Sequence, residues 1–274
     1  MNRITPILEG PLVSVVRFDH PPDAAHRDPD FEGSSSCHFS LVERGEFQLS
    51  AGRTHWRLAA GMGFFTFPGA VYSCRHSEER PTDVCLSVEY RTGFVEEILG
   101  EDREWQSGEG IRVLPPSNRL GYFQWLLGGP TASTRLGVET LAGELMAGVF
   151  SPDLQKHSQP CRGPQLKWYA ERIDAARTIL ETRFFEDHSL RDLGRVVGIS
   201  PYHLAHVFRD LTGLPPHRYL LRVRMKQACA RLRDGESVTR TCYEVGFSNL
   251  SHFIRSFRRT YGVSPSRIAL VVRQ

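Results

Sequence analysis

The sequence predicts an α+β protein of two domains, the first built from antiparallel strands followed by helices and the second entirely helical. Three observations support this prediction: short alternating apolar runs in the first half, an internal repeat in the second half, and a change of charge sign between the halves. A chain of 274 residues is long enough for two ordinary domains.

The composition is that of a globular protein, with 40% hydrophobic and 24% charged residues. The first ten residues, MNRITPILEG, lack the apolar core of a signal peptide, and no run approaches the ~20 apolar residues of a membrane helix. The six cysteines form no C-x-x-C pair, which argues against a disulfide framework or a zinc ribbon. We therefore expect a cytosolic protein with no membrane partner and no cofactor.

The net charge of +3 conceals a strong asymmetry. Residues 1–160 hold 14 Lys and Arg against 21 Asp and Glu, a balance of −7, whereas residues 161–274 hold 20 against 10, a balance of +10. This asymmetry indicates a polyanion, such as nucleic acid, as a partner of the second half only.

The first half is rich in short strand-like segments separated by Gly, Pro or charged turns. Their close spacing is typical of an antiparallel sandwich or barrel. Two helices are expected after them, over 118–128 and 133–150, and the second carries an apolar stripe of Val138, Leu141, Leu145 and Val149. The predicted strands cover 38–43, 46–50, 54–58, 63–67, 71–75 and 84–90.

Residues 151–165, SPDLQKHSQPCRGPQ, contain three prolines and no hydrophobic periodicity. The charge balance also changes sign across this segment, which we interpret as a linker. The predicted domains are therefore residues 1–150 and 166–274.

The second half shows successive helix-start and helix-stop signals. Ile173, Ala176, Leu180 and Phe184 form one apolar face of a first helix. Later helices are expected to begin at Ser189, Ser200, Ser237, Ser248 or Asn249, and Ser264, and an arginine-rich helix is expected over 216–233.

A phrase of this helical half occurs twice. Residues 197–213 read VGISPYHLAHVFRDLTG, and residues 245–262 read VGFSNLSHFIRSFRRTYG. Leu204 and Phe208 correspond to Phe253 and Phe257 at an offset of 49 residues. Each phrase predicts a short helix, a glycine turn and a capped second helix, which is the helix-turn-helix pattern that places its second helix in the DNA major groove. The partner that repeats in register with such a pair is DNA, whose major groove returns to one face every ~34 Å.

Burial of the apolar anchors leaves a defined outward face on each second helix. Arginine suits guanine edges and phosphates, serine and histidine suit several base edges, and tyrosine or leucine suits a thymine methyl group. The candidate DNA-binding residues are Tyr202, Ala205, His206 and Arg209 in the first unit and Leu250, Ser251, Arg255, Arg258 and Arg259 in the second.

At these motifs the sequence resembles the AraC/XylS family of bacterial transcription regulators. The resemblance covers residues 166–270 and rests on SLRDLGRVVGISPYHLAHVFRDLTGLPPHRYL and SVTRTCYEVGFSNLSHFIRSFRRTYGVSPSRI. It implies an all-α domain with two helix-turn-helix units that binds promoter DNA. The family's base-contacting role falls by position on Tyr202, Ala205, His206, Leu250, Ser251 and Arg255, although Ala205 is too short for a polar base contact.

The family also implies a role for the first half. Its members often carry an N-terminal cupin-like β-barrel that binds a small effector, followed by helices that dimerise, and HFSLVERGEFQLSAGRTHWRLAAGMGFFTFPGAVY looks like such a barrel. His38, Trp56 and Tyr72 are candidate effector contacts. The resemblance further implies a homodimer, which we expect to form through the Val138–Val149 stripe, and makes RNA polymerase a further candidate partner.

Two alternatives for the first half remain open from the sequence. A cupin enzyme would bind a metal through an H-x-H pair, and no such pair occurs here, while Tyr72 stands where a further ligand would follow the Pro68-Gly69 turn. Cys37, Cys74 and Cys85 could bind a soft metal if the three converged, or two of them could form a regulatory disulfide, although single cysteines are usually ordinary buried residues.

Overall fold

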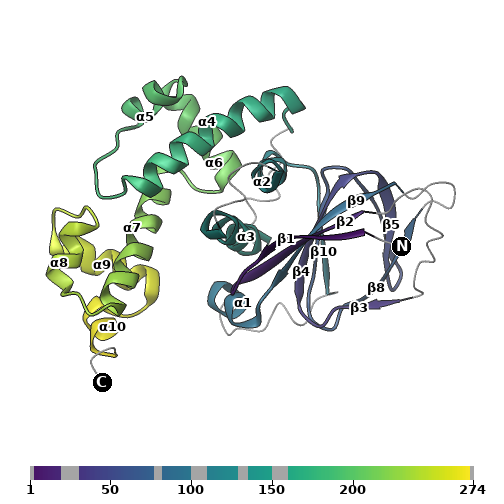
Figure 1. The fold of residues 1–274 in the computed structure, drawn as a ribbon, viewed down its shortest axis with the longest axis horizontal. Coiled ribbons are helices and arrows are strands. Elements are labelled where there is room, and N and C mark those ends of the chain that lie inside the picture. The colour runs from purple at the N-terminus through teal and green to yellow at the C-terminus, as the bar shows by residue number, and fades with distance from the viewer. Residues whose placement is uncertain are drawn as a thin grey trace. The chain divides into compact units, whose positions relative to one another are not determined.

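The chain folds into two compact units, residues 1–167 (unit 1) and 168–274 (unit 2). A computed structural model shows strands and helices in unit 1 and helices in unit 2 (Figure 1). No helix in the described part of the chain has the length and apolar character needed to cross a membrane. The structure describes residues 3–19, 31–76, 82–99, 110–128, 135–149 and 160–271.

The described strands of unit 1 form two antiparallel sheets. Each of the six predicted strands is present to within a residue or two, and β1, β2, β3 and β10 add to them. The larger sheet has the order β1 (Arg3–Glu9), β2 (Val13–Asp19), β9 (Val84–Tyr90), β4 (Cys37–Arg44), β7 (Gly63–Thr66) and β10 (Ile111–Leu114). The smaller sheet has the order β3 (Glu32–Gly33), β8 (Val71–His76), β5 (Glu46–Ala51) and β6 (Thr54–Ala59).

An apolar core lies between the two sheets. Directly opposed residues of an antiparallel pair share a face, so the pairing of Leu49 with both Trp56 and Cys74 puts these three side chains on one side of the smaller sheet. They pack in one cluster with Val42 and Phe64 of the larger sheet. Alternation along the strands thus divides each sheet into a core face and a second face.

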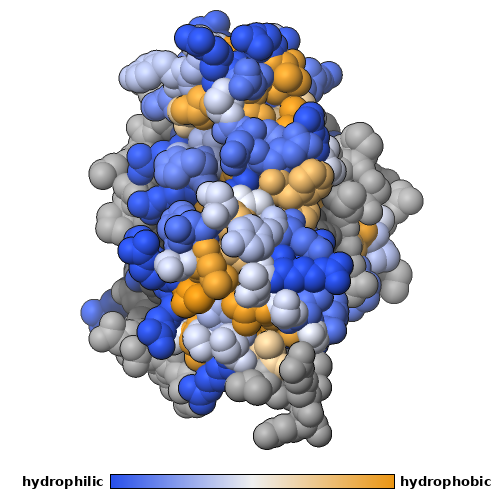
Figure 2. Space-filling model, turned by 90° about the vertical axis from the view of Figure 1, so that its left-hand side faces the viewer, coloured by the Kyte–Doolittle hydropathy of each residue, from blue (hydrophilic) through white to orange (hydrophobic). Residues whose placement is uncertain are grey.

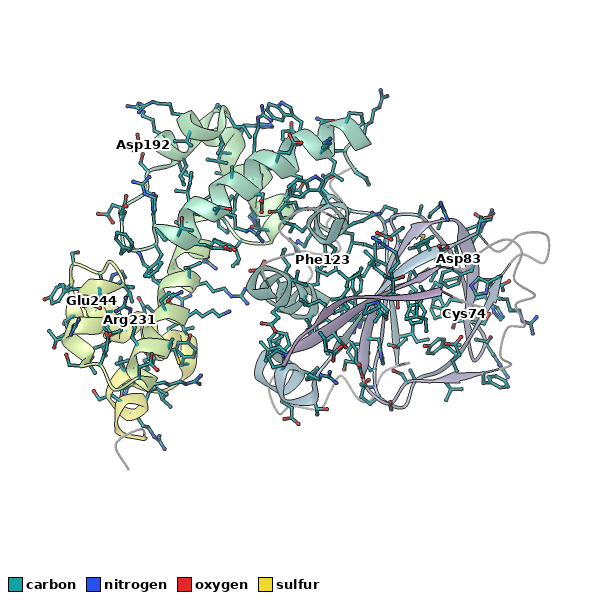
Figure 3. The ribbon with its side chains drawn as sticks, in the orientation of Figure 1. Cys74, Asp83, Phe123, Asp192, Arg231 and Glu244 are labelled. Carbon is teal, nitrogen blue, oxygen red and sulfur yellow. The ribbon has the colours of Figure 1, made fainter. Side chains whose placement is uncertain are left out.

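Helices cover the second face of the larger sheet. The Phe39 and Phe123 rings lie 6.0 Å apart, which joins β4 to α2 (Asn118–Gly128), and the Tyr90 hydroxyl donates to the Ala142 carbonyl of α3 (Arg135–Val149) at 2.9 Å. Helix α1 (Thr92–Leu99) also packs on α3. Figure 3 labels Phe123 among the side chains that fill this region.

The predicted dimer stripe on α3 is wrong as an intermolecular contact. Val138, Leu141 and Leu145 are at most 4% exposed in the single chain, and Val149 has a side chain outside the described residues. The apolar periodicity of α3 correctly predicted burial, but the stripe is already covered within the chain and is unavailable to a second copy.

Unit 2 consists of most of α4 and the helices that follow it, as expected from their start and stop signals. Helix α4 packs through Ile173, Ala176 and Leu180, whereas Phe184 lies beyond its end and contacts a separate core cluster. Helix α4 begins at Gly163, inside the predicted linker, of which 151–159 lie outside the described residues. The helices are α4 (Gly163–Thr182), α5 (Leu190–Val197), α6 (Pro201–Thr212), α7 (Pro216–Arg233), α8 (Val238–Glu244), α9 (Leu250–Tyr261) and α10 (Pro265–Val271).

The repeated phrases form two similar helix pairs, α5–α6 and α8–α9. Ser200 caps α6, and Asn249 rather than Ser248 caps α9, because the Asn249 side chain accepts the His252 backbone N–H at 2.9 Å. Glycines in left-handed conformation, Gly213 and Gly262, end these two helices. The 49-residue offset therefore relates two equivalent structures.

Candidate nucleic-acid interface

Helix α6 is held by four apolar side chains on one face. Leu204, Phe208 and Leu211 are completely buried, as expected, and Val207 joins them. Burial of this face leaves Tyr202, at 87% exposure, together with His206 and Arg209 in solvent, while Ala205 is half-buried. The predicted contact face of the α5–α6 pair is therefore available to a ligand.

One histidine of α6 points to a neighbouring helix instead. His203 Nε2 lies 2.9 Å from the hydroxyl of Tyr169 on α4, and the two rings are 5.4 Å apart. This contact supports a structural role for His203.

Helix α9 shares two of these anchoring positions and has a more basic outer face. Phe253 and Phe257 are completely buried, and Ser251, Arg255, Arg258 and Arg259 are exposed. Leu250 differs from the prediction, since it is half-buried and packs against the core that contains Phe253. A leucine at the first position of the helix completes the apolar cluster, so less of its side chain is exposed than the prediction requires.

The face of the molecule seen in Figure 2 is mainly hydrophilic, with apolar side chains gathered in small separate patches. A hydrophilic surface of this kind suits a polar partner better than an apolar one.

Two arginines of α7 have functions that sequence reasoning missed. Arg224 and Arg231 lie in the arginine-rich helix expected over 216–233, but both side chains contact other segments of unit 2. A single sequence gives no signal that separates them from Arg222 or Arg233, because all four lie in one arginine-rich run.

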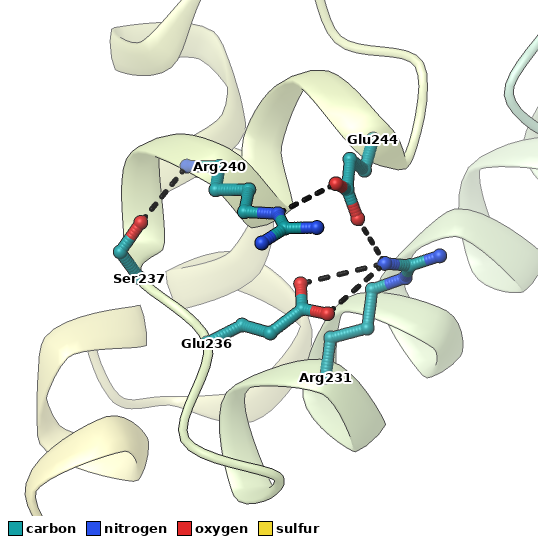
Figure 4. A network of polar contacts seen from close by, with 5 residues as sticks. All are labelled: Arg231, Glu236, Ser237, Arg240 and Glu244. Carbon is teal, nitrogen blue, oxygen red and sulfur yellow. Dashed lines mark hydrogen bonds and ion pairs between the residues drawn. The ribbon is translucent and has the colours of Figure 1, made fainter.

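Arg231 is the centre of an ion-pair network at the base of the second helix pair (Figure 4). Its Nη1 contacts the Glu236 carboxylate at 3.2 Å and also the Glu244 carboxylate, whose other oxygen accepts from Arg240 Nε at 2.7 Å. The hydrogen bond from Arg240 holds the pKa of Glu244 below its ordinary value, and Arg231 acts in the same direction. The network joins the end of α7 to α8.

In unit 1 the three candidate effector contacts lie on the facing surfaces of the two sheets. His38 pairs in register with Thr66 and Glu89 on the larger sheet, and its Nδ1 lies 3.2 Å from the Ser34 hydroxyl. Trp56 and Tyr72 are half-buried on the core face of the smaller sheet. Burial, followed by the charge of Glu32, raises the pKa of Tyr72, so its hydroxyl stays protonated and can donate a hydrogen bond.

An open pocket of about 450 Å³ also lies on the smaller sheet. Register places Gln48 between Arg57 and Arg75 on the face opposite the core, and Arg57 is paired with Glu46 at 2.5 Å. This hollow is thus formed largely by solvent-facing polar side chains. Its lining residues are Glu46, Phe47, Gln48, His55, Trp56, Arg57, Arg75 and His76.

The three cysteines do not converge on one site, which contradicts the soft-metal site that would use all three, although Cys74 and Cys85 pack in the same core cluster. Cys37 and Cys85 pair with Tyr90 and Val42, respectively, and lie on opposite faces of the larger sheet, while Cys74 lies in the smaller sheet (Figure 3). Burial raises the pKa of Cys37 to about 11, and burial likewise raises that of Cys85, so both thiols are protonated and poor nucleophiles. Within the described ranges no three His, Cys, Asp or Glu side chains are placed to hold a metal ion.

Comparisons with known proteins agree with this geometry. A family model described as a helix-turn-helix domain matches residues 193–269. The chain is 37% identical over 237 residues to the HTH-type transcriptional activator RhaS of Enterobacter sp. (strain 638), which covers 76% of this chain and 81% of that protein. It is also 30% identical over 112 residues to the probable transcriptional regulator LumQ of Photobacterium leiognathi, which covers 38% of this chain and 44% of that protein.

Among solved structures, a probable AraC family transcriptional regulator from Rhodopseudomonas palustris CGA009 matches with 28% identity and a TM-score of 0.36. That match covers 38% of this chain and 99% of the solved chain. Together with the long match to the RhaS activator, the helix-turn-helix match shows that the chain belongs to the AraC/XylS family of DNA-binding transcriptional regulators and not to a family of enzymes.

Proposed function

We propose that unit 2 binds double-stranded promoter DNA with α6 and α9 in successive major-groove segments on one face of the duplex. The observation that carries this proposal is the pair of equivalent capped helices, each anchored by buried apolar residues and each presenting polar or basic side chains. The contacts assigned to α6 are Tyr202, Ala205, His206 and Arg209, and those assigned to α9 are Leu250, Ser251, Arg255, Arg258 and Arg259.

The arginines of α9 are assigned two different kinds of contact. Arg255 is the residue assigned to a base edge, since arginine can make two hydrogen bonds to guanine in the major groove. Arg258 and Arg259 lie nearer the C-terminal end of α9 and are assigned to phosphates, which position the protein without reading sequence.

Unit 1 acts as the control element in this proposal. It closes as a cupin-like barrel, binds a small organic effector near His38, Trp56 and Tyr72, and shifts the protein toward the DNA-binding arrangement. Such a shift requires that the effector bind one arrangement more tightly than the other. The proposed boundaries are residues 1–150 for this domain, 151–165 for the linker and 166–274 for the DNA-binding domain, and the protein acts as a homodimer whose contact is not the α3 stripe.

The DNA part is tested with the full chain and fragmented DNA of its source genome. Sequencing of the retained fragments should show a site with two elements about 10–10.5 base pairs apart, one helical turn. Binding to that site should weaken steeply with salt, because each phosphate contact releases counterions, and Arg258→Ala should reduce the salt slope by about one unit. Retention without any shared site, or a flat salt dependence, would contradict the proposed interface.

The effector part is tested by a thermal-shift screen of small organic molecules. A ligand at 100 times its Kd should stabilise the full chain by about 2.7 kcal/mol. His38→Ala should abolish this shift, while His55→Ala should retain it, because His55 lies on the solvent face of the smaller sheet and donates to or accepts from Ser50 at 2.8 Å. An equal shift in wild type and His38→Ala would exclude His38 as a contact.

A further inference from the structure

Arg224 of α7 makes two hydrogen bonds to the segment between α4 and α5. Its Nε donates to the Phe184 carbonyl at 2.7 Å, and its Nη2 donates to the Glu186 carbonyl at 2.9 Å. The Asp187 carboxylate lies 3.6 Å from Nη2. One guanidinium thus fixes the backbone that leads into the first helix of the α5–α6 pair.

The same guanidinium also packs against the turn of the second helix pair. Its central carbon lies 5.8 Å from the centroid of the Phe247 ring, within range of a cation–π contact. Gly246 has a φ of +86°, and a Cβ there would lie 2.9 Å from the Arg224 Cζ and 2.6 Å from the Phe185 carbonyl oxygen. Only a glycine allows the turn to approach this closely.

Arg224 therefore lies between the lead-in segment of one helix pair and the turn of the other. The side chain is only 12% exposed, and the planar fork of arginine provides two N–H directions that a lysine cannot reproduce. In the α5–α6 turn, by contrast, a Cβ on Gly198 would meet nothing within 4 Å.

We propose that Arg224 is a positioning residue that sets the orientation of α9 relative to α6, and thereby the spacing of the two DNA elements that the protein accepts. This inference rests on the proposed binding of α6 and α9 to successive grooves. When both helices bind one duplex, the second contact is intramolecular, and its advantage is lost if the geometry does not match.

The experiment compares the full-chain wild type with Arg224→Lys and Arg224→Met, and uses Arg183→Met as the matched control. Arg183 lies in the same inter-helix segment, but its guanidinium pairs with the Glu186 carboxylate at 2.9 Å and its side chain is 58% exposed. The DNA probes are the selected two-element site, versions with one or two base pairs added to or removed from the spacer, and a version with one element scrambled.

We expect wild type and Arg183→Met to prefer one spacer length. Arg224→Lys should bind the two-element site on the order of 10- to 100-fold more weakly, discriminate less between spacers, and bind the one-element site unchanged. Unchanged spacer preference in Arg224→Lys would overturn the proposal. An equal loss on one-element and two-element DNA would also overturn it, since that result indicates unfolding rather than misorientation.

Failure of the underlying function has a different signature. If wild-type protein does not distinguish two-element from one-element DNA, then binding to successive grooves is wrong regardless of Arg224. Thermal unfolding of each variant, measured in parallel, confirms that the binding assays are made on folded protein, and Arg224→Lys provides the comparison if Arg224→Met is unstable.

Discussion

The α5–α6 and α8–α9 helix pairs share one backbone plan, but they differ in surface charge and in how their turns are held. The outward face of α6 carries Tyr202 and His206 with a single arginine, whereas α9 carries Arg255, Arg258 and Arg259. The α5–α6 turn is open at Gly198, while the α8–α9 turn at Gly246 is packed against Arg224.

This difference shows that the buried residues that hold each helix and the exposed residues proposed to contact DNA follow separate constraints. Two buried anchors coincide at the 49-residue offset, Leu204 with Phe253 and Phe208 with Phe257, because both pairs must bury an apolar face against α7 and its neighbours. The exposed positions do not have that constraint, and there the two helices differ. His206 of α6 corresponds to Arg255 of α9. A strong arginine contact in α9 and a weaker, shape-dependent contact in α6 are the expected consequence.

The largest expected effects test whether the two pairs are equally anchored. Phe208→Ala and Phe257→Ala should each lower the free energy of unfolding by about 3–5 kcal/mol, because both rings are completely buried at equivalent positions. Urea unfolding measures this change, and Thr260→Ala, at an exposed position of α9, is the control. A loss of unfolding free energy below about 1 kcal/mol for one of these variants would show that the two helix pairs are not equivalently anchored.

A smaller effect tests the difference in reading. Arg255→Ala should weaken specific binding by about 1–3 kcal/mol and relax the preference at the second DNA element, while His206→Ala should change the first element by less. Selection from randomised DNA, followed by affinity measurement, reports both effects. An unchanged sequence preference in Arg255→Ala would reject its assignment to a base.

The helix caps sharpen the comparison of stability. Asn249→Ala should cost about 1 kcal/mol, since its side-chain oxygen accepts the His252 N–H at 2.9 Å. Ser200→Ala should cost less, because the corresponding bond from the His203 N–H is 3.4 Å long. The two variants are compared by urea unfolding under one condition, and a larger cost for Ser200→Ala would show that these bond lengths do not rank the caps.

The smallest effect concerns the ion-pair network around Arg231 at the base of the second pair. The lowered pKa of Glu244 means that its stabilisation is fully present above the ordinary glutamate pKa and is lost as pH falls through the lowered value. Glu244→Gln should therefore lower the Tm near neutral pH, and the difference from wild type should disappear as the pH falls below the lowered pKa of Glu244. Glu171→Gln, at an exposed carboxylate of α4, is the control, and a Tm difference independent of pH would contradict the role of the charge.

Local sequence patterns predicted much of the fold. Alternation predicted the strands from β4 to β9, and the serine and glycine signals predicted the helix limits of unit 2. Strands β1, β2, β3 and β10 were missed, since they are short or irregular in pattern and the pairing of β2 and β10 depends on the distant strands β9 and β7. Leu250 was placed outward because helical periodicity alone does not show that the cluster around Phe253 extends to the start of α9.

The sequence by itself determined the repeat, the basic outer face of α9 and the buried anchors, because each depends on residue type at a helical spacing. Only the tertiary structure decided that the α3 stripe is covered within the chain, that Cys37 and Cys85 lie on opposite faces of one sheet, and that Arg224 lies between the two helix pairs. These outcomes depend on which distant segments meet, and a local pattern shows that a side chain is apolar or charged without showing what it will contact.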